Sequence, residues 1–217
     1  MHPMRPVIPM APMWPKLPPP PLASTATRRR PPWRAPSEAR CVALWDRYEM
    51  PEHIRAHSAK VALVATQVAE AALAKGMAVC VDTVRASALL HDIAKAYCIQ
   101  HGGHHGQLGG AWAMTATGHP VLAQGVIHHM YWPFELDYPR FFTPLAVLYG
   151  DKRVAHDQIV PIEHRFGDLL DRYGKTQEIR ERIESTNRQA KTIEDALSKL
   201  LEKDLNAHDF DRRRLVE

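Results

Sequence analysis

The chain has 217 residues, three cysteines and a formal charge of +4 at pH 7. Residues 1–37 hold six of the 28 basic side chains and none of the 24 acidic ones, so the remaining residues carry slightly more negative than positive charge. A basic domain that binds nucleic acids specifically is therefore not indicated. Three cysteines without a Cys-x-x-Cys pair argue against a disulfide framework or a zinc finger and are typical of a cytoplasmic protein.

Residues 1–37 differ from the rest of the chain in composition. They contain twelve of the 18 prolines. Because proline fixes φ and lacks an N–H donor, we expect a disordered, Pro- and Arg-rich leader here. Prolines interrupt each candidate for a secretory signal, and no run of about 18 apolar residues predicts a membrane span. We expect one folded domain at 38–175 and a C-terminal helix with its tail at 176–217.

Beyond the leader the apolar residues recur at helical spacing, and no strand-like alternation is sustained. The first predicted helix covers 51–75, where Ile54, Val61, Val64 and Val68 share one face. Further helices are predicted at 82–95, 108–117, 120–130 and 142–154, with a glycine- and histidine-rich loop at 101–110. The last one, at 177–205, is long and amphipathic, and we expect it to pack on the domain or to form a homodimer. The predicted fold class is all-α.

Four polar residues fall at the inner sides or ends of these helices: His57, the adjacent pair His91 and Asp92, and Asp151. A lone buried histidine is more often a satisfied core residue than a ligand. A buried aspartate, however, is costly without a cation or hydrogen-bond partners. One divalent ion would satisfy all four residues, because imidazoles and carboxylates form a mixed site suited to Fe²⁺, Mn²⁺, Ni²⁺, Zn²⁺ or Mg²⁺.

The order of these residues resembles the HD superfamily of metal-dependent phosphohydrolases. The resemblance covers about residues 50–160. It is carried by three segments: His57-Ser58, Leu89-Leu90-His91-Asp92-Ile93-Ala94-Lys95 and Tyr149-Gly150-Asp151-Lys152-Arg153-Val154. It implies an HD-domain helical bundle in which His57, His91, Asp92 and Asp151 bind a metal. It also implies hydrolysis of a nucleotide or another small phosphate ester; a non-catalytic regulatory or nucleotide-binding protein of the same fold is the alternative.

Members of this superfamily with two metals place further histidines between the His-Asp pair and the last aspartate, and this interval is rich in histidine here. The sequence leaves open whether one or two ions bind, and for a second ion the resemblance favours His105 and His128 as ligands. Three other histidines stand behind them as candidates: His104, His119 and His129.

The same resemblance suggests roles in the reaction. Asp92 is expected to accept a proton from the attacking water, and Lys95, one helical turn after His91, to hold a phosphate oxygen. Three further side chains are candidates for binding the substrate: Lys152, Arg153 and His129. For Arg153 a structural salt bridge to Asp157 is the alternative.

Overall fold

The computed structural model describes residues 33–210, and within them the fold is all-α, as predicted. The predicted leader falls largely on residues 1–32, which lie outside the described residues. The elements are α1 (Glu38–Arg47), α2 (Glu52–Ala74), α3 (Val81–Leu90), α4 (Lys95–His101), α5 (His105–Thr117), α6 (Pro120–His128), α7 (Tyr138–Lys152), β1 (Val154–Ala155), β2 (Gln158–Ile159), α8 (Ile162–Tyr173) and α9 (Gln177–Leu201). No helix among the described residues is long and apolar enough to cross a membrane.

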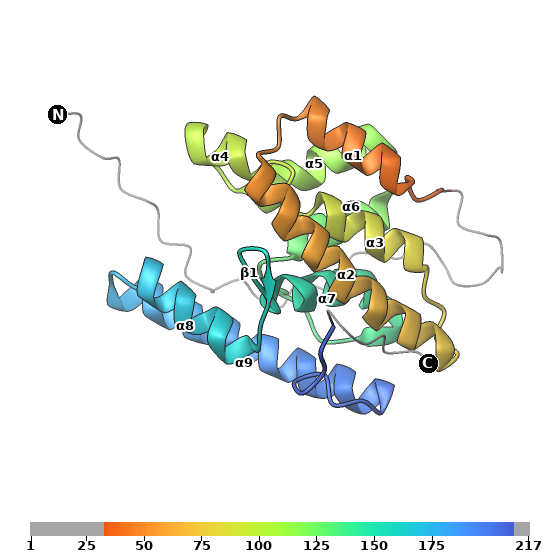
Figure 1. The fold of residues 1–217 in the computed structure, drawn as a ribbon, viewed down its shortest axis with the longest axis vertical. Coiled ribbons are helices and arrows are strands. Elements are labelled where there is room, and N and C mark those ends of the chain that lie inside the picture. Colours follow the sequence, from red (N-terminus) through yellow and green to blue (C-terminus); the bar gives the residue numbers. More distant parts are fainter. Residues whose placement is uncertain (1–32, 211–217) are drawn as a thin grey trace.

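Helix α2 runs through the middle of the molecule and packs on α3 and α7 (Figure 1). Its Val61, Val64 and Val68 are fully buried, as the apolar spacing requires. Gly150 of α7 faces this helix, where a Cβ atom would lie 3.0 Å from the carbonyl oxygen of Val61. The missing side chain lets the two helices approach closely beside Asp151, and this approach sets the distance between the polar ends of α2 and α7.

The segment after α3 differs from the prediction. The helix ends at Leu90, residues 91–94 form a turn, and the separate helix α4 follows. The predicted loop at 101–110 shrinks to residues 102–104, where Gly102 and Gly103 adopt φ values of 78° and 102° that other residues rarely take. The side chain of His104 then accepts a hydrogen bond from the backbone N–H of Gln107, so it caps α5 at an earlier residue than predicted.

Helix α8 and the small antiparallel hairpin of β1 and β2 were not predicted. The hairpin reverses the chain after α7, and α8 then lies alongside α9 on the opposite side of the molecule from α1, α4 and α5 (Figure 1). Only Ile162 and Phe166 of α8 are buried. Its amphipathic pattern is short, which explains why it was overlooked.

Helix α9 covers the core with its second half. Ala190, Ile193 and Leu197 are fully buried within the same chain, whereas Ile179, near the start of the helix, is 37% exposed. Packing on the domain, the first of the two predicted roles, therefore accounts for the C-terminal half of the apolar stripe. Homodimer formation through this helix stays a prediction.

Arg153 ties α9 to the rest of the fold. Its guanidinium donates hydrogen bonds to the Tyr149 hydroxyl at 2.6 Å, to Glu194 at 3.2 Å, and to the backbone carbonyls of Val160 and Leu205. The side chain is 3% exposed, and it pairs with Glu194 rather than with Asp157. The expected role of Arg153 in substrate binding is therefore not what the structure shows: each of these partners belongs to the protein.

We expect Arg153→Met to lower the free energy of unfolding by about 3–5 kcal/mol, because it leaves the buried Glu194 carboxylate without its counterion. The double variant Arg153→Met/Glu194→Leu should be less destabilised, since it buries no unpaired charge. Urea unfolding of both variants measures this difference. A loss below about 1 kcal/mol for the single variant would contradict the role of Arg153.

Candidate metal centre

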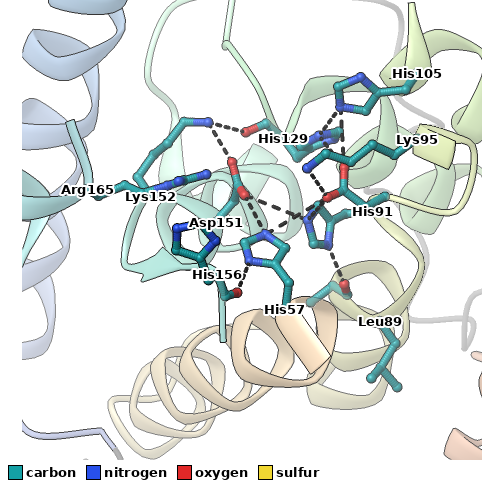
Figure 2. Close-up of polar contacts among 12 residues, drawn as sticks. His57, Leu89, His91, Lys95, His105, His129, Asp151, Lys152, His156 and Arg165 are labelled. Carbon is teal, nitrogen blue, oxygen red and sulfur yellow. Dashed lines mark hydrogen bonds and ion pairs between the residues drawn. The ribbon is translucent and has the colours of Figure 1, made fainter. Parts of the chain in front are cut away.

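The four residues of the first predicted site converge on one point. His57 comes from α2, His91 from the turn after α3, and Asp151 from α7 (Figure 2). Asp92 follows His91 in the same turn. His57 Nε2 lies 3.1 Å from Asp151 Oδ1 and 3.9 Å from Asp92 Oδ2. His91 Nε2 lies 3.4 Å from Asp92 Oδ2 and 3.7 Å from Asp151 Oδ1. Residues separated by up to 94 positions thus form a single buried polar cluster.

A second group meets the other oxygen of Asp92. His105 Nε2 lies 3.3 Å and His129 Nε2 3.5 Å from Asp92 Oδ1. The two ring nitrogens are themselves 3.2 Å apart. Nitrogens at this distance hold either a proton or a cation between them. Asp92 therefore directs one oxygen to each group. His57, His91 and Asp92 offer three ligand atoms within 4.8 Å of one another, as do Asp92, His105 and His129, whereas Asp151 belongs to neither set of three.

Backbone carbonyls fix the orientation of three rings. The Nδ1 atoms of His57, His91 and His129 lie 2.7–2.8 Å from the carbonyl oxygens of His156, Ala88 and Val126, respectively. A carbonyl oxygen only accepts, so each Nδ1 carries the proton and each Nε2 is left facing the centre. Metal-binding histidines are oriented in this way, with a hydrogen bond from the second ring nitrogen.

Two atoms of the cluster lack an adequate partner within residues 33–210. His91 Nε2 and Asp92 Oδ1 are buried and make no hydrogen bond. Leaving such atoms unsatisfied costs about 1–3 kcal/mol each. A cation between the imidazole nitrogens and carboxylate oxygens would remove that cost. The buried histidines and aspartates can therefore hold a metal ion.

The charges of the cluster are coupled. Burial alone would raise the pKa of Asp92, but the neighbouring His91, together with the nearby ring nitrogens of His105 and His129, outweighs that effect and holds the pKa well below its ordinary value. Burial would likewise raise the pKa of Asp151, and Lys152 and His57 reverse that effect. Both carboxylates are thus ionised at neutral pH. Burial lowers the pKa of His129 to about 4, so its ring is the neutral ligand that metals prefer.

His128, the favoured ligand of the second group, lies outside it. Its ring meets those of Trp132 and Phe134 edge-on, at centroid distances of 5.2 and 5.6 Å, and burial lowers its pKa to about 4. The structure instead brings its neighbour His129, expected to bind substrate, to Asp92 and His105. Helix α6 ends at His128. Because successive residues project about 100° apart, only one ring of the pair can face Asp92.

The two remaining histidine candidates are helix caps. His104 Nδ1 accepts a hydrogen bond from the backbone N–H of Gln107, and His119 Nδ1 accepts one from that of Leu122, at the starts of α5 and α6, respectively. Neither residue belongs to a candidate metal-binding group.

His105 reaches the centre because α5 and α6 approach closely. A Cβ atom on Gly110 would lie 2.2 Å from Ile127 Cγ1, and one on Gly106 would lie 2.8 Å from the Ile127 carbonyl oxygen. These glycines looked like parts of a loop in the sequence. In the structure they line the contact that carries His105 to His129.

The centre forms the floor of a cavity of about 690 Å³. Lys95 Nζ lies 2.7 Å from Asp92 Oδ2, and Lys152 Nζ lies 2.6 Å from Asp151 Oδ2 (Figure 2). Burial lowers the pKa of Lys95, and the charge of Arg165 lowers it slightly. The opposing effect of Asp92 and Asp151 is larger, so the pKa of Lys95 lies above its ordinary value. Both lysines therefore bring positive charge to the cavity.

Helix α8 supplies four further lining residues that sequence reasoning missed: Arg165, Leu169, Arg172 and Tyr173.

Comparisons of the chain with known protein families, with curated proteins and with solved structures found no match. The resemblance of its motifs to the HD superfamily therefore stays a hypothesis. What the site can do is argued from its geometry and its chemistry alone.

We expect His129→Gln to lower the metal content of the protein, because it deletes one of the three candidate ligand atoms of the second group, whereas the matched His128→Gln should not. Metal analysis of both variants, purified side by side without chelator, measures the difference. Equal metal contents, or a loss confined to His128→Gln, would contradict the assignment.

Metal binding should also release protons. Burial would lower the pKa of His91, but Asp92 and Asp151 raise it above 6.5, so below pH 6.5 the metal-free protein keeps a proton there that an ion must displace. In the metal-free protein this proton stabilises the fold below pH 6.5, and the stabilisation is lost as pH rises through the raised pKa.

We therefore expect protons to be released on adding Mn²⁺ at about pH 6, below the raised pKa of His91, and an affinity that increases with pH. A pH indicator in weakly buffered solution measures the release. No proton release, together with an affinity that is independent of pH, would be the contrary result.

Proposed function

We propose that this chain is a metal-dependent phosphohydrolase of the HD type, which cleaves a nucleotide or another small phosphate ester. The observation that carries the proposal is the position of Asp92. Its two oxygens face two histidine-containing groups on the floor of an open cavity, with lysine ammonium groups beside both carboxylates. Transition-metal ions such as iron, manganese, nickel or zinc suit the mixed nitrogen and oxygen ligands, and Mg²⁺ remains an alternative.

A divalent ion in such a site supplies Lewis acidity, which activates water and neutralises the charge of a phosphate. The five residues that would hold one or two ions around Asp92 are His57, His91, Asp151, His105 and His129. Four of them are buried, and His105 is partly buried, so their interactions with an ion are little screened by solvent. The complete set of ligands favours turnover over a non-catalytic binding role.

Lys95 is the residue best placed to bind the phosphate. Its ammonium group lies at the junction between the buried Asp92 and the cavity, and its side chain is 35% exposed. It can turn its donors from the carboxylate to a phosphate oxygen without leaving the site. Lys152, at 7% exposure, is held by Asp151 and by the His129 carbonyl oxygen, so it orients Asp151 more than it faces substrate.

The low pKa of Asp92 bears on its expected second role. A general base works best when its pKa lies near the working pH, and the pKa of Asp92 lies well below its ordinary value. We therefore propose that Asp92 acts chiefly as the shared ligand.

With Mn²⁺ or Fe²⁺ added, the protein should hydrolyse p-nitrophenyl phosphate. Asp151→Asn should reduce turnover by about 100-fold or more, because it removes a charged ligand without changing the shape of the side chain. Asp157→Asn is the matched control, since it alters an exposed carboxylate on the rim of the same cavity. Turnover that survives chelation, or equal rates in the two variants, would overturn the proposal.

A further inference from the structure

Helix α8 turns one face toward the cavity. Arg165, Leu169, Arg172 and Tyr173 follow one another at spacings of four, three and one, which places them on one side of a helix. The candidate metal centre contributes other residues to the lining of the same cavity. The cavity is thus lined by histidines, aspartates and lysines at its floor and by two arginines on its side.

The arginines of α8 are poorly neutralised. Both NH1 atoms lie 3.4 Å from the same oxygen of Asp168, and His156 Nε2 lies 3.7 Å from its other oxygen. An ordinary pair on the neighbouring helix, Arg182 with Glu178, closes to 2.6 Å. One carboxylate therefore serves two guanidinium groups at long distance, and positive charge remains on this wall of the cavity.

Arg165 has a donor that the protein does not use. Its Nε atom is buried and has no hydrogen-bond partner among the described residues. Its side chain is only 11% exposed, so the guanidinium is largely shielded from bulk water. Guanidinium groups match phosphate and carboxylate oxygens through paired N–H donors.

We propose that Arg165 and Arg172 form a second anion subsite, which binds a second phosphate or carboxylate group of the substrate. This inference rests on the proposed function, because the first phosphate would lie at the metal centre in the same cavity. The substrate class is then an organic phosphate with two anionic groups. Leu169 lies between the two arginines on the same face of α8 and offers an apolar contact for the carbon skeleton of that molecule.

The test compares three non-hydrolysable probes by calorimetry on the full chain as purified: propane-1,3-diphosphonate, 4-phosphonobutyrate and propylphosphonate. They carry two phosphonates, one phosphonate with a carboxylate, and one phosphonate alone. The variant is Arg165→Met/Arg172→Met. The matched control is Arg188→Met, which removes an exposed positive charge on α9, away from the cavity.

For at least one of the two dianionic probes, the double variant should weaken binding by about 10- to 100-fold, as expected for lost charge-assisted hydrogen bonds. Binding of propylphosphonate should change little, and Arg188→Met should leave all three affinities unaltered. The stronger of the two dianionic probes identifies the second group as phosphate or carboxylate. Circular dichroism of the double variant checks that α8 still folds.

The two proposals fail separately. Equal affinity of the double variant and the wild type for both dianionic probes, or no binding of either probe by the wild type, would overturn the subsite. If p-nitrophenyl phosphate is still hydrolysed in that case, the proposed function stands alone. If a dianionic probe binds in a manner that depends on the arginines but p-nitrophenyl phosphate is not hydrolysed, the subsite is supported and the proposed phosphohydrolase activity is contradicted.

Discussion

The arrangement of the site depends on one buried carboxylate. Asp92 is 1% exposed, and its two oxygens face different histidine groups. An ionised carboxylate in such a place needs compensating charge from several sides. In the structure the positive charge comes from Lys95, whose ammonium group lies 2.7 Å away, and from His91, and the ring nitrogens of His57, His105 and His129 lie within 3.9 Å of the carboxylate. Imidazole nitrogens and carboxylate oxygens face one another here at short distances without full hydrogen bonding, as in a site that could hold a metal ion.

The residues around this carboxylate come from helices that are distant in the sequence, and small residues at the helix contacts let these helices pack closely. Gly150 lets α7 approach α2, and Gly106 and Gly110 let α5 approach α6. A residue of the candidate metal centre lies beside each contact: Asp151 in the first case and His105 in the second. The turn that bears Asp92 lies between them. The polar centre is therefore positioned by packing of the helices rather than by a flexible loop.

The fold class and most residues of the candidate metal centre could be predicted from the sequence. The other predictions were wrong or missing for physical reasons. The all-α class followed from apolar spacing, and the grouping of His57 with Asp151 followed from motif order. The choice between His128 and His129 depends on where α6 ends, and a difference of one residue turns the ring by about 100°. Arg165 was missed because α8 is short and because no motif marks a residue that reaches a cavity from the side. Arg153 beside Asp151 looked functional, although only the tertiary structure shows its partners in α9 and beyond it.

Elemental analysis of the wild-type protein, purified under nitrogen and without chelator, tests the central claim most directly. The shared position of Asp92 between two groups predicts about two transition-metal ions per chain. A single ion would restrict the centre to one of the groups and leave the other as an ordinary hydrogen-bonded cluster. No bound metal, with none regained after Mn²⁺, Fe²⁺ or Ni²⁺ is added, would contradict the account.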